Sequence, residues 1–471
     1  MSDDKELKQW KEKLFYQPKN GYDRIDAEQT GEIFAYAEGY KQFLNAARTE
    51  REAVKEAIRM AEAEGFVPYT FGMELQPGSK VYVNNRGKAL MLAVLGQQPL
   101  DHGCVIAGAH IDSPRLDLKQ TPMYEDSELA YFKTHYYGGI KKYQWVTLPL
   151  ALHGVVVKKD GTVVEIRIGE EEGDPVFCVT DLLIHLSQEQ MKKNAAKVIE
   201  GEDLDILVGN YPLKDGEKES VKAGVLKLVE EQYGIEEEDF LSAELVLVPA
   251  GRARDLGFDR SMILAYGQDD RVCAYTSLVA MIESSAPRKR TSCCLLVDKE
   301  EIGSVGATGM QSHFFENILA ELMNACGQYS ELGLRRCLAN SKMLSSDVSS
   351  AYDALYASAY DKKNVAYLGR GMVFNKFTGA RGKSGSNDAN AEYLGEIRRM
   401  LEKHDVHFQL AELGRVDLGG GGTIAYIMSL YGMQVIDSGV GVLSMHAPWE
   451  ATSKVDIYET KKGYMAFLAE A

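Results

Sequence analysis

The chain has 471 residues, and its 69 acidic side chains outnumber its 53 lysines and arginines, which gives a formal net charge of −16 at pH 7. This acidic surplus argues against nucleic acid or an anionic membrane as a partner. A chain of this length is expected to hold more than one hydrophobic core. No apolar stretch is long enough to span a membrane.

The amino-terminal residues and the cysteines indicate the compartment. The opening run MSDDKELKQWKEK is charged and lacks the apolar region of a secretory signal, so we expect a cytoplasmic protein. The seven cysteines are an odd number without a C-x-x-C pair, which favours reduced, buried thiols over a structural zinc finger. A metal held by carboxylates and imidazoles is compatible with this composition.

The first part of the chain predicts a helix, a hairpin and a buried strand. Residues 42–66 have apolar positions at helical spacing up to Gly65, which predicts one amphipathic helix. The strand-like runs SKVYVNN and KALMLAVLG flank turn residues and predict a hairpin. Residues 104–109 predict a short buried strand that ends at His110, Ile111 and Asp112.

From about residue 121 to 244 the pattern changes, which predicts a mostly β insertion. Within it, the aromatic and glycine-rich stretch THYYGGIKKYQW could form a lid or an assembly contact, and we favour packing. Beyond it, strands at 261–268, 293–297, 342–346 and 434–446 alternate with helical patterns, and a helix over 456–470 closes the chain. The alternation predicts a discontinuous α/β domain, residues 1–120 and 245–471, in which helices cover both faces of a mixed sheet in three layers.

Polar side chains follow the predicted strands at the places where each strand ends. In open α/β sheets, loops at the carboxyl ends of the strands converge over one crevice. Imidazole and carboxylate groups suit zinc, with manganese or cobalt as alternatives, and a shared carboxylate lets such a set hold two ions. The residues at these strand ends are His110, Asp269, Glu300, Glu301, Asp347 and His446.

Each of these residues alone is a weak signal. A histidine at a strand end is more often a hydrogen-bonded structural residue, and tandem glutamates usually lie in a solvated loop. Glu300 and Glu301, however, closely follow the buried-looking run 293–297, where two desolvated carboxylates would be costly without a cation. The joint pattern therefore favours a metal site.

The strings GAHIDSPRLDL, DDR, DKEEIGS, SSD and VLSMHAPWE resemble the ligand motifs of the aspartyl aminopeptidase family of di-zinc exopeptidases. The resemblance extends from about residue 30 to the end of the chain and keeps the order of the family's motifs. It implies that one zinc is held by His110 and Asp347, the other by Glu301 and His446, and that Asp269 bridges both. Animal members carry Asn after the bridging Asp, whereas this chain has Asp270, so the bridge could be assigned to Asp270; we favour Asp269.

The same resemblance implies the catalytic roles. Glu300 is expected to be the general base that takes a proton from a metal-bridging water and returns it to the departing amine. Asp112 is expected to accept a hydrogen bond from the free ring nitrogen of His110 and so fix its tautomer.

The resemblance also implies substrate and assembly. Lys376 matches the basic position that would select acidic amino-terminal residues. Ala-Pro-Trp-Glu after His446 departs from the motif of animal members. His185 resembles the histidine that reaches a neighbour's active site to stabilise the oxyanion; the alternative, from the residues alone, is a capped or core histidine on a short helix. Family members form a dodecamer built from dimers, in which the insertion 121–244 is the dimer-forming domain.

The leading hypothesis is therefore a metallo-aminopeptidase that removes single, acidic amino-terminal residues from peptides. One alternative is another two-metal hydrolase, such as a carboxypeptidase or deacylase, which could share every ligand. A second alternative is a catalytically silent assembly protein on the same fold. The intact ligand set and Glu300 argue against the silent protein, because a retired site has no physical reason to keep a buried cluster of like charges.

Overall fold

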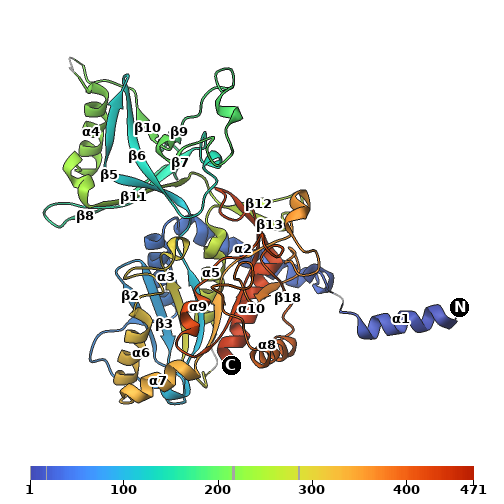
Figure 1. Cartoon of the computed structure of the whole chain (residues 1–471). Helices are drawn as coiled ribbons and strands as arrows, with labels where there is room; N and C mark the ends of the chain where they lie inside the picture. Colours follow the sequence, from blue (N-terminus) through green and yellow to red (C-terminus); the bar gives the residue numbers. More distant parts are fainter. Residues whose placement is uncertain (1, 17, 215–217, 285–286) are drawn as a thin grey trace.

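The computed structural model describes residues 2–16, 18–214, 218–284 and 287–471, which form three sheets (Figure 1). The largest has nine strands, and its central members β14, β4, β15 and β19 run parallel to one another. The expected hairpin is confirmed as the antiparallel pair β2·β3. In spatial order, the strands of this sheet are β1 (Val67–Pro68), β2 (Lys80–Asn85), β3 (Ala89–Val94), β14 (Ser292–Val297), β4 (Val105–His110), β15 (Lys342–Ser346), β19 (Gln434–Gly439), β17 (Met372–Asn375) and β18 (Phe408–Leu410).

Helices cover both faces of the nine-stranded sheet, which confirms the three-layer arrangement. Along β4, Val105 and Ala107 belong to one buried cluster while Ile106 belongs to the other, because successive side chains of a strand point to opposite faces. One face is covered by α2 (Ala27–Ala46), α3 (Glu50–Ala63), α5 (Gln268–Glu283), α8 (Ala391–Lys403) and α10 (Lys454–Glu470), and the other by α6 (Phe314–Ala325), α7 (Glu331–Asn340) and α9 (Ala425–Ser429).

A seven-stranded sheet forms a separate lobe, at the top of Figure 1. It carries α4 (Ser220–Tyr233) and has its own buried cluster around the fully buried Trp145. Its strands span residues 115–249 and so include the whole 121–244 segment, whose independence as a domain stays a prediction. In spatial order they are β8 (Val163–Ile168), β7 (Leu150–Val157), β11 (Ala243–Pro249), β5 (Arg115–Asp126), β6 (Leu129–Tyr137), β10 (Ile206–Gly209) and β9 (Cys178–Val179).

The third sheet corrects the prediction of a single strand over 434–446. The chain leaves β19 of the large sheet at Gly439 and enters β20 of a different sheet at Gly441. The small sheet has five strands, in the order β12 (Arg254–Leu256), β13 (Met262–Ala265), β21 (Glu450–Ser453), β20 (Gly441–Leu443) and β16 (Ser349–Ser350).

The single helix predicted over 42–66 is also wrong, because the structure has two helices there. The chain leaves α2 at Ala47, and Thr49 caps α3 by accepting the backbone N–H of Glu52, whose side chain in turn accepts the backbone N–H of Thr49.

Before these two helices, α1 (Ser2–Leu14) projects away from the rest of the chain (Figure 1). All seven cysteines are unpaired, as expected, but Cys178 and Cys326 are only partly buried. No helix among the described residues is both long enough and apolar enough to cross a membrane.

Candidate metal centre

The expected strand-end residues meet where the large and small sheets adjoin. His110 ends β4, Glu300 and Glu301 lie on a short 3-10 helix after β14, and Asp347 directly follows β15, so three neighbouring parallel strands contribute as predicted. Asp269 and His446 come from a different sheet, whereas a single sheet was expected to carry all of these residues. They follow strands β13 and β20 of the small sheet.

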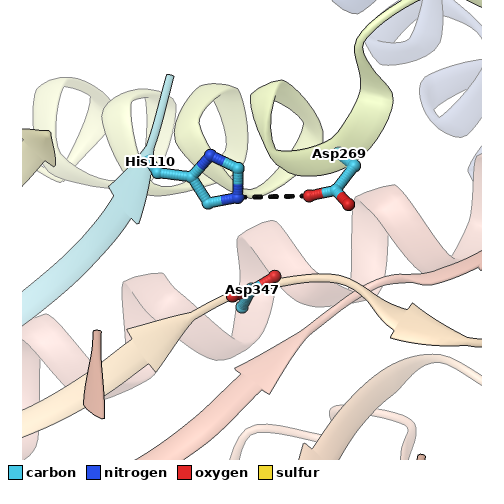
Figure 2. Close-up of side chains that lie close together, drawn as sticks. All are labelled: His110, Asp269 and Asp347. Atoms are coloured by element: carbon cyan, nitrogen blue, oxygen red, sulfur yellow. Dashed lines mark hydrogen bonds and ion pairs between the residues drawn. The ribbon is translucent and has the colours of Figure 1, made fainter. Parts of the chain in front are cut away.

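The side chains form two groups that share Asp269. One group contains His110, Asp269 and Asp347, and the other contains Asp269, Glu301 and His446; within each, the potential ligand atoms lie within 4.8 Å of one another. Oδ1 of Asp269 lies 3.1 Å from Nε2 of His110, as Figure 2 shows, and its Oδ2 lies 3.2 Å from Nε2 of His446. The two oxygens of one carboxylate thus face the two histidines separately.

Asp112 joins His110 to the glutamate pair. Its Oδ1 lies 3.2 Å from Nδ1 of His110 and accepts the backbone N–H of Glu300 at 3.1 Å. Its Oδ2 accepts the backbone N–H of Glu301 at 3.2 Å and the hydroxyl of Tyr137 at 2.8 Å. Burial disfavours the charged form, but the contacts with His110 and Tyr137 outweigh it and lower the pKa of Asp112. The orienting role expected for Asp112 is therefore compatible with its position.

The electrostatics of the centre fit a cation. Burial raises the pKa of Glu300 to about 7, and burial together with neighbouring carboxylates raises the pKa values of Glu301 and Asp347 well above the ordinary range. Oε1 of Glu301 is buried and has no hydrogen-bond partner within the part of the chain that the structure describes. Desolvated carboxylates beside imidazoles are a donor set that binds zinc, and a bound cation would remove the cost of their mutual repulsion.

Burial opposes the charge of the histidines as well, yet hydrogen bonds to carboxylates outweigh it. The contact with Asp269 raises the pKa of His446 to about 10, and Asp112 and Asp269 raise that of His110. The same two histidines hold the pKa of Asp269 below its ordinary value despite burial. Asp269 therefore carries the negative charge of the cluster most readily, as a shared ligand should.

Two further buried acidic residues lie beside Asp269. Asp270 was left as the alternative bridging ligand, and Glu450 was not predicted to have a role. Asp270 is fully buried, and neither of its carboxylate oxygens has a hydrogen-bond partner among the described residues. It belongs to neither ligand group. Glu450 accepts the backbone N–H of Asp269 at 3.1 Å and that of His446 at 2.8 Å. Its only sequence signal is its place in the string VLSMHAPWE, four residues beyond His446.

Lys376 follows β17 and is paired with a carboxylate of its own chain. Its Nζ contacts Asp388, which also accepts from Lys383 at 2.9 Å. The preceding Asn375 donates to the hydroxyl of Ser349, just beyond Asp347, at 3.3 Å. A pocket of about 390 Å³ opens beside this segment, between residues 377–383 and 412–420.

His185 lies between β9 and β10 of the seven-stranded lobe. The short helix expected around it is wrong, because residues 184–189 form a turn. His185 is exposed, and in the part of the chain that the structure describes no hydrogen bond or ion pair joins it to the metal-binding candidates. Its neighbours Leu183, Ile184 and Leu186 are exposed by 54%, 68% and 67%.

Comparisons with known proteins identify one family. A model of the family described as aminopeptidase I zinc metalloprotease (M18) matches residues 43–468. The "Probable M18 family aminopeptidase 1" of Clostridium acetobutylicum is 60% identical over 460 residues, which cover 97% of this chain and 99% of that protein.

Two crystal structures are similar over almost the whole chain. The M18 family aminopeptidase of Thermotoga maritima has a TM-score of 0.93 at 43% identity and covers 97% of this chain and 100% of its own. Aminopeptidase I of Clostridium acetobutylicum has a TM-score of 0.89 at 56% identity, with the same coverage of 97% and 100%.

Proposed function

The chain belongs to the M18 family of aminopeptidase I zinc metalloproteases, and we therefore propose that it removes single, preferentially acidic, amino-terminal residues at a pair of metal ions. It is a zinc-dependent aminopeptidase, a hydrolase of peptide bonds. Family membership thereby selects the aminopeptidase over the carboxypeptidase, the deacylase and the silent assembly protein that share such a scaffold.

The observation that carries the two-metal proposal is the position of Asp269. It is the one residue common to both ligand groups, and its two oxygens face different histidines at 3.1 and 3.2 Å. A carboxylate placed in this way can bridge two ions, as paired-metal hydrolases require. His110 and Asp347 would complete one site, while Glu301 and His446 would complete the other.

The chain's own residues supply the proton transfer. Oε2 of Glu300 lies 3.9 Å from Nε2 of His110, so this carboxylate borders the ligand groups without belonging to either. Glu300 takes a proton from the attacking water and delivers it to the departing amine. Asp112 holds the backbone of Glu300 and the ring of His110 at once. Bound zinc would supply Lewis acidity toward the scissile carbonyl.

An acidic preference is supported by the positive charges beside the centre. Lys376 and Lys383 share the single carboxylate of Asp388, so the three side chains together keep one positive charge. Arg381 and Arg415 line the adjoining pocket together with Glu412 and Asp417, so the positive charge of this region rests on the excess cation of the lysine pair. A substrate carboxylate would be attracted to this region and could compete with Asp388 for Lys376.

Assembly into a homo-oligomer completes the proposal. Exposed apolar residues around His185 are typical of a protein interface. In the proposed oligomer, His185 reaches the active site of a neighbouring subunit, as its resemblance to the family histidine implies. The solved structure of S. cerevisiae mApe1 is a dodecamer; at 20% identity and a TM-score of 0.75 that likeness concerns the fold, so a dodecamer built from dimers is part of the proposal for this chain. A cytoplasmic location stays a prediction from the amino-terminal sequence.

Metal analysis combined with a reporter panel tests the proposal. After zinc loading and removal of free metal, we expect about two zinc ions per chain. Aminoacyl reporters with a free amine should be hydrolysed, fastest for Asp and Glu, and the same reporters acetylated on nitrogen should not. One ion per chain would contradict the bridged pair, and faster cleavage of apolar than acidic residues would contradict the preference.

A further inference from the structure

The stretch Tyr137–Gly138–Gly139 leaves the seven-stranded lobe and reaches the metal centre. We call these three residues the β6 tip, since Tyr137 ends β6. They contact Asp112, Glu301 and His446, as described below. We infer that the β6 tip positions the proposed metal ligands, so that the second lobe holds the geometry of the centre within its own chain. This inference rests on the metal-binding roles in the proposed function and adds the residues that orient those ligands.

Tyr137 completes the hydrogen bonding of Asp112. Its hydroxyl donates to Oδ2 of Asp112 at 2.8 Å, and the only other donor to that oxygen is the backbone N–H of Glu301, at 3.2 Å, among the described residues. Oδ1 of the same carboxylate faces Nδ1 of His110 and the backbone N–H of Glu300. Nδ1 of His110 also lies 3.1 Å from the backbone carbonyl oxygen of Asp112. Removing the Tyr137 hydroxyl would leave the fully buried carboxylate with one donor fewer, so that it would hold the His110 ring and the glutamate segment less firmly.

The ring of Tyr137 is itself held in place. Strand pairing puts Tyr137 directly opposite Arg115, whose guanidinium lies 4.0 Å from the centre of the tyrosine ring. Arg115 in turn pairs with Asp117 at 2.8 Å and with Glu50, at the start of α3, at 3.1 Å. The hydroxyl is therefore directed at Asp112 by contacts with both lobes, which is the pre-organisation expected of a positioning residue.

Gly139 acts on the other histidine. Its carbonyl oxygen lies 3.0 Å from Nδ1 of His446 and can accept the proton of that nitrogen. This places the lone pair of the neutral ring on Nε2, the atom that faces Asp269 at 3.2 Å. A backbone carbonyl that fixes the tautomer of a ligating histidine is a recurrent device in metal sites.

Gly138 allows the close approach. Its φ of +77° lies in the left-handed region, and a Cβ there would meet Oε2 of Glu301 at 3.3 Å and Cβ of Glu301 at 3.4 Å. A Cβ on Gly139 would lie 3.4 Å from Nδ1 of His446. The two glycines therefore bring the backbone of the β6 tip against two proposed ligands, where any side chain would press on them.

Replacement of the Tyr137 hydroxyl tests the inference directly. In zinc-loaded full-length Tyr137→Phe, the ring and its contact with Arg115 are kept and only the hydrogen bond to Asp112 is lost. We expect zinc transfer to a chromogenic chelator to be about tenfold faster than in the unchanged protein. We also expect kcat to fall while KM stays the same. Because the lost hydroxyl also satisfies a buried carboxylate, the melting temperature of the metal-free protein should fall as well.

The control is Tyr136→Phe, since Tyr136 is the adjacent tyrosine, is 40% exposed and makes no hydrogen bond through its hydroxyl among the described residues. It should release zinc at the unchanged rate. Equal zinc release and equal kcat in Tyr137→Phe and Tyr136→Phe would overturn the inference. A lower melting temperature of metal-free Tyr137→Phe with unchanged zinc release would mean that Tyr137 serves lobe packing alone, and would overturn it as well.

A second pair of variants separates contact with the ligands from backbone strain. Gly138→Ala and Gly161→Ala both place a Cβ at a positive φ, +77° and +88°, in the same lobe, but nothing lies within 4 Å of a Cβ at Gly161. Only Gly138→Ala should accelerate zinc release. If the protein without any substitution binds no zinc, the proposed function itself is refuted. Failure of the proposed function is therefore distinguishable from failure of the inference about the β6 tip.

Discussion

Asp112 accepts the backbone N–H of Glu300 at 3.1 Å, so the carboxylate that faces the ring of His110 also fixes the start of the segment that carries the proposed base. This contact uses the backbone of Glu300 and leaves its side chain free. The chemistry of the Glu300 side chain can therefore be changed without disturbing the support of the centre.

Glu300→Gln should abolish most turnover while leaving the metal in place. Glutamine keeps the size and the backbone N–H of Glu300 but cannot take a proton from water, and loss of a general base costs roughly 10²- to 10⁴-fold in rate. We expect kcat to fall within that range and zinc content, measured by atomic spectroscopy, to equal that of the unchanged protein. Full activity in this variant would remove Glu300 from the mechanism.

Asp269→Asn and Asp270→Asn should differ in zinc content. Each oxygen of Asp269 faces one histidine, whereas Asp270 is buried outside both ligand groups and burial raises its pKa well above the ordinary range. A neutral amide at 269 would remove the shared anion, so we expect that variant to lose zinc. The amide at 270 changes a side chain that lies outside both ligand groups, so zinc should be kept. The reverse result would assign the bridge to Asp270.

Lys376→Met should lower the preference for acidic amino-terminal residues. A hydrogen bond to a charged group contributes about 1.5 to 3 kcal/mol, so kcat/KM for Asp and Glu reporters should fall by tenfold or more, with Ala and Leu reporters little changed. The matched control is Lys383→Met, which removes the other cation on Asp388. Equal losses for acidic and apolar reporters would show that Lys376 supports the fold and does not read the substrate.

Mixing of two inactive variants should restore activity if His185 acts in a neighbouring subunit. His185→Ala lacks the residue offered to the neighbour, and Glu300→Gln lacks its own base. In a mixed oligomer, a subunit with intact Glu300 can receive His185 from its neighbour, so partial activity should return after the subunits are exchanged. Each variant incubated alone is the control, and continued inactivity of the mixture, with exchange verified by mass spectrometry, would contradict the proposal.

Much of the centre could be predicted from the sequence because its signals are local. His110, Glu301 and Asp347 each follow a buried strand of one parallel sheet, and the carboxyl ends of such strands meet at one edge. His446 was placed near the site for a partly wrong reason, since the predicted strand over 434–446 is divided between two sheets at Val440. A continuous apolar run does not reveal a change of sheet.

The contacts of the β6 tip could not be predicted in the same way. Tyr137 reaches Asp112 only because the register of the β5·β6 pair sets it opposite Arg115, and register follows from the completed sheet. The break between α2 and α3 did have a local signal, the Thr49 to Glu52 capping box, but apolar spacing on both sides of it favoured one continuous helix.

A buried ion cluster outside the centre predicts how stability depends on pH. His153 is fully buried, with Nδ1 3.0 Å from Glu52 and Nε2 3.0 Å from Glu170. Arg48 pairs with Glu170 at 2.7 Å, and Arg167 lies 3.5 Å from Glu52. Burial opposes all the charges of His153, Glu52 and Glu170, yet their mutual contacts raise the pKa of His153 and lower those of both glutamates.

The sign of each contribution follows from these shifts. The raised pKa of His153 stabilises the fold fully below about pH 6.5, its unfolded value, and this stability is lost as pH rises through the folded pKa. The lowered pKa values of Glu52 and Glu170 stabilise it above about pH 4.5 and are lost as pH falls through their folded values. Denaturant midpoints should therefore be highest in the window between these two limits.

His153→Asn should remove the high-pH part of this dependence. Loss of one partner from a buried ion pair costs about 3 kcal/mol, because the carboxylates stay buried without their shared cation, so the urea midpoint at pH 6 should fall clearly. His404→Gln is the control, since His404 pairs with Glu470 at the surface and such pairs contribute about 0 to 1 kcal/mol. A midpoint for His153→Asn that matches the control between pH 5 and 6.5 would mean that the His153 cluster does not stabilise the fold.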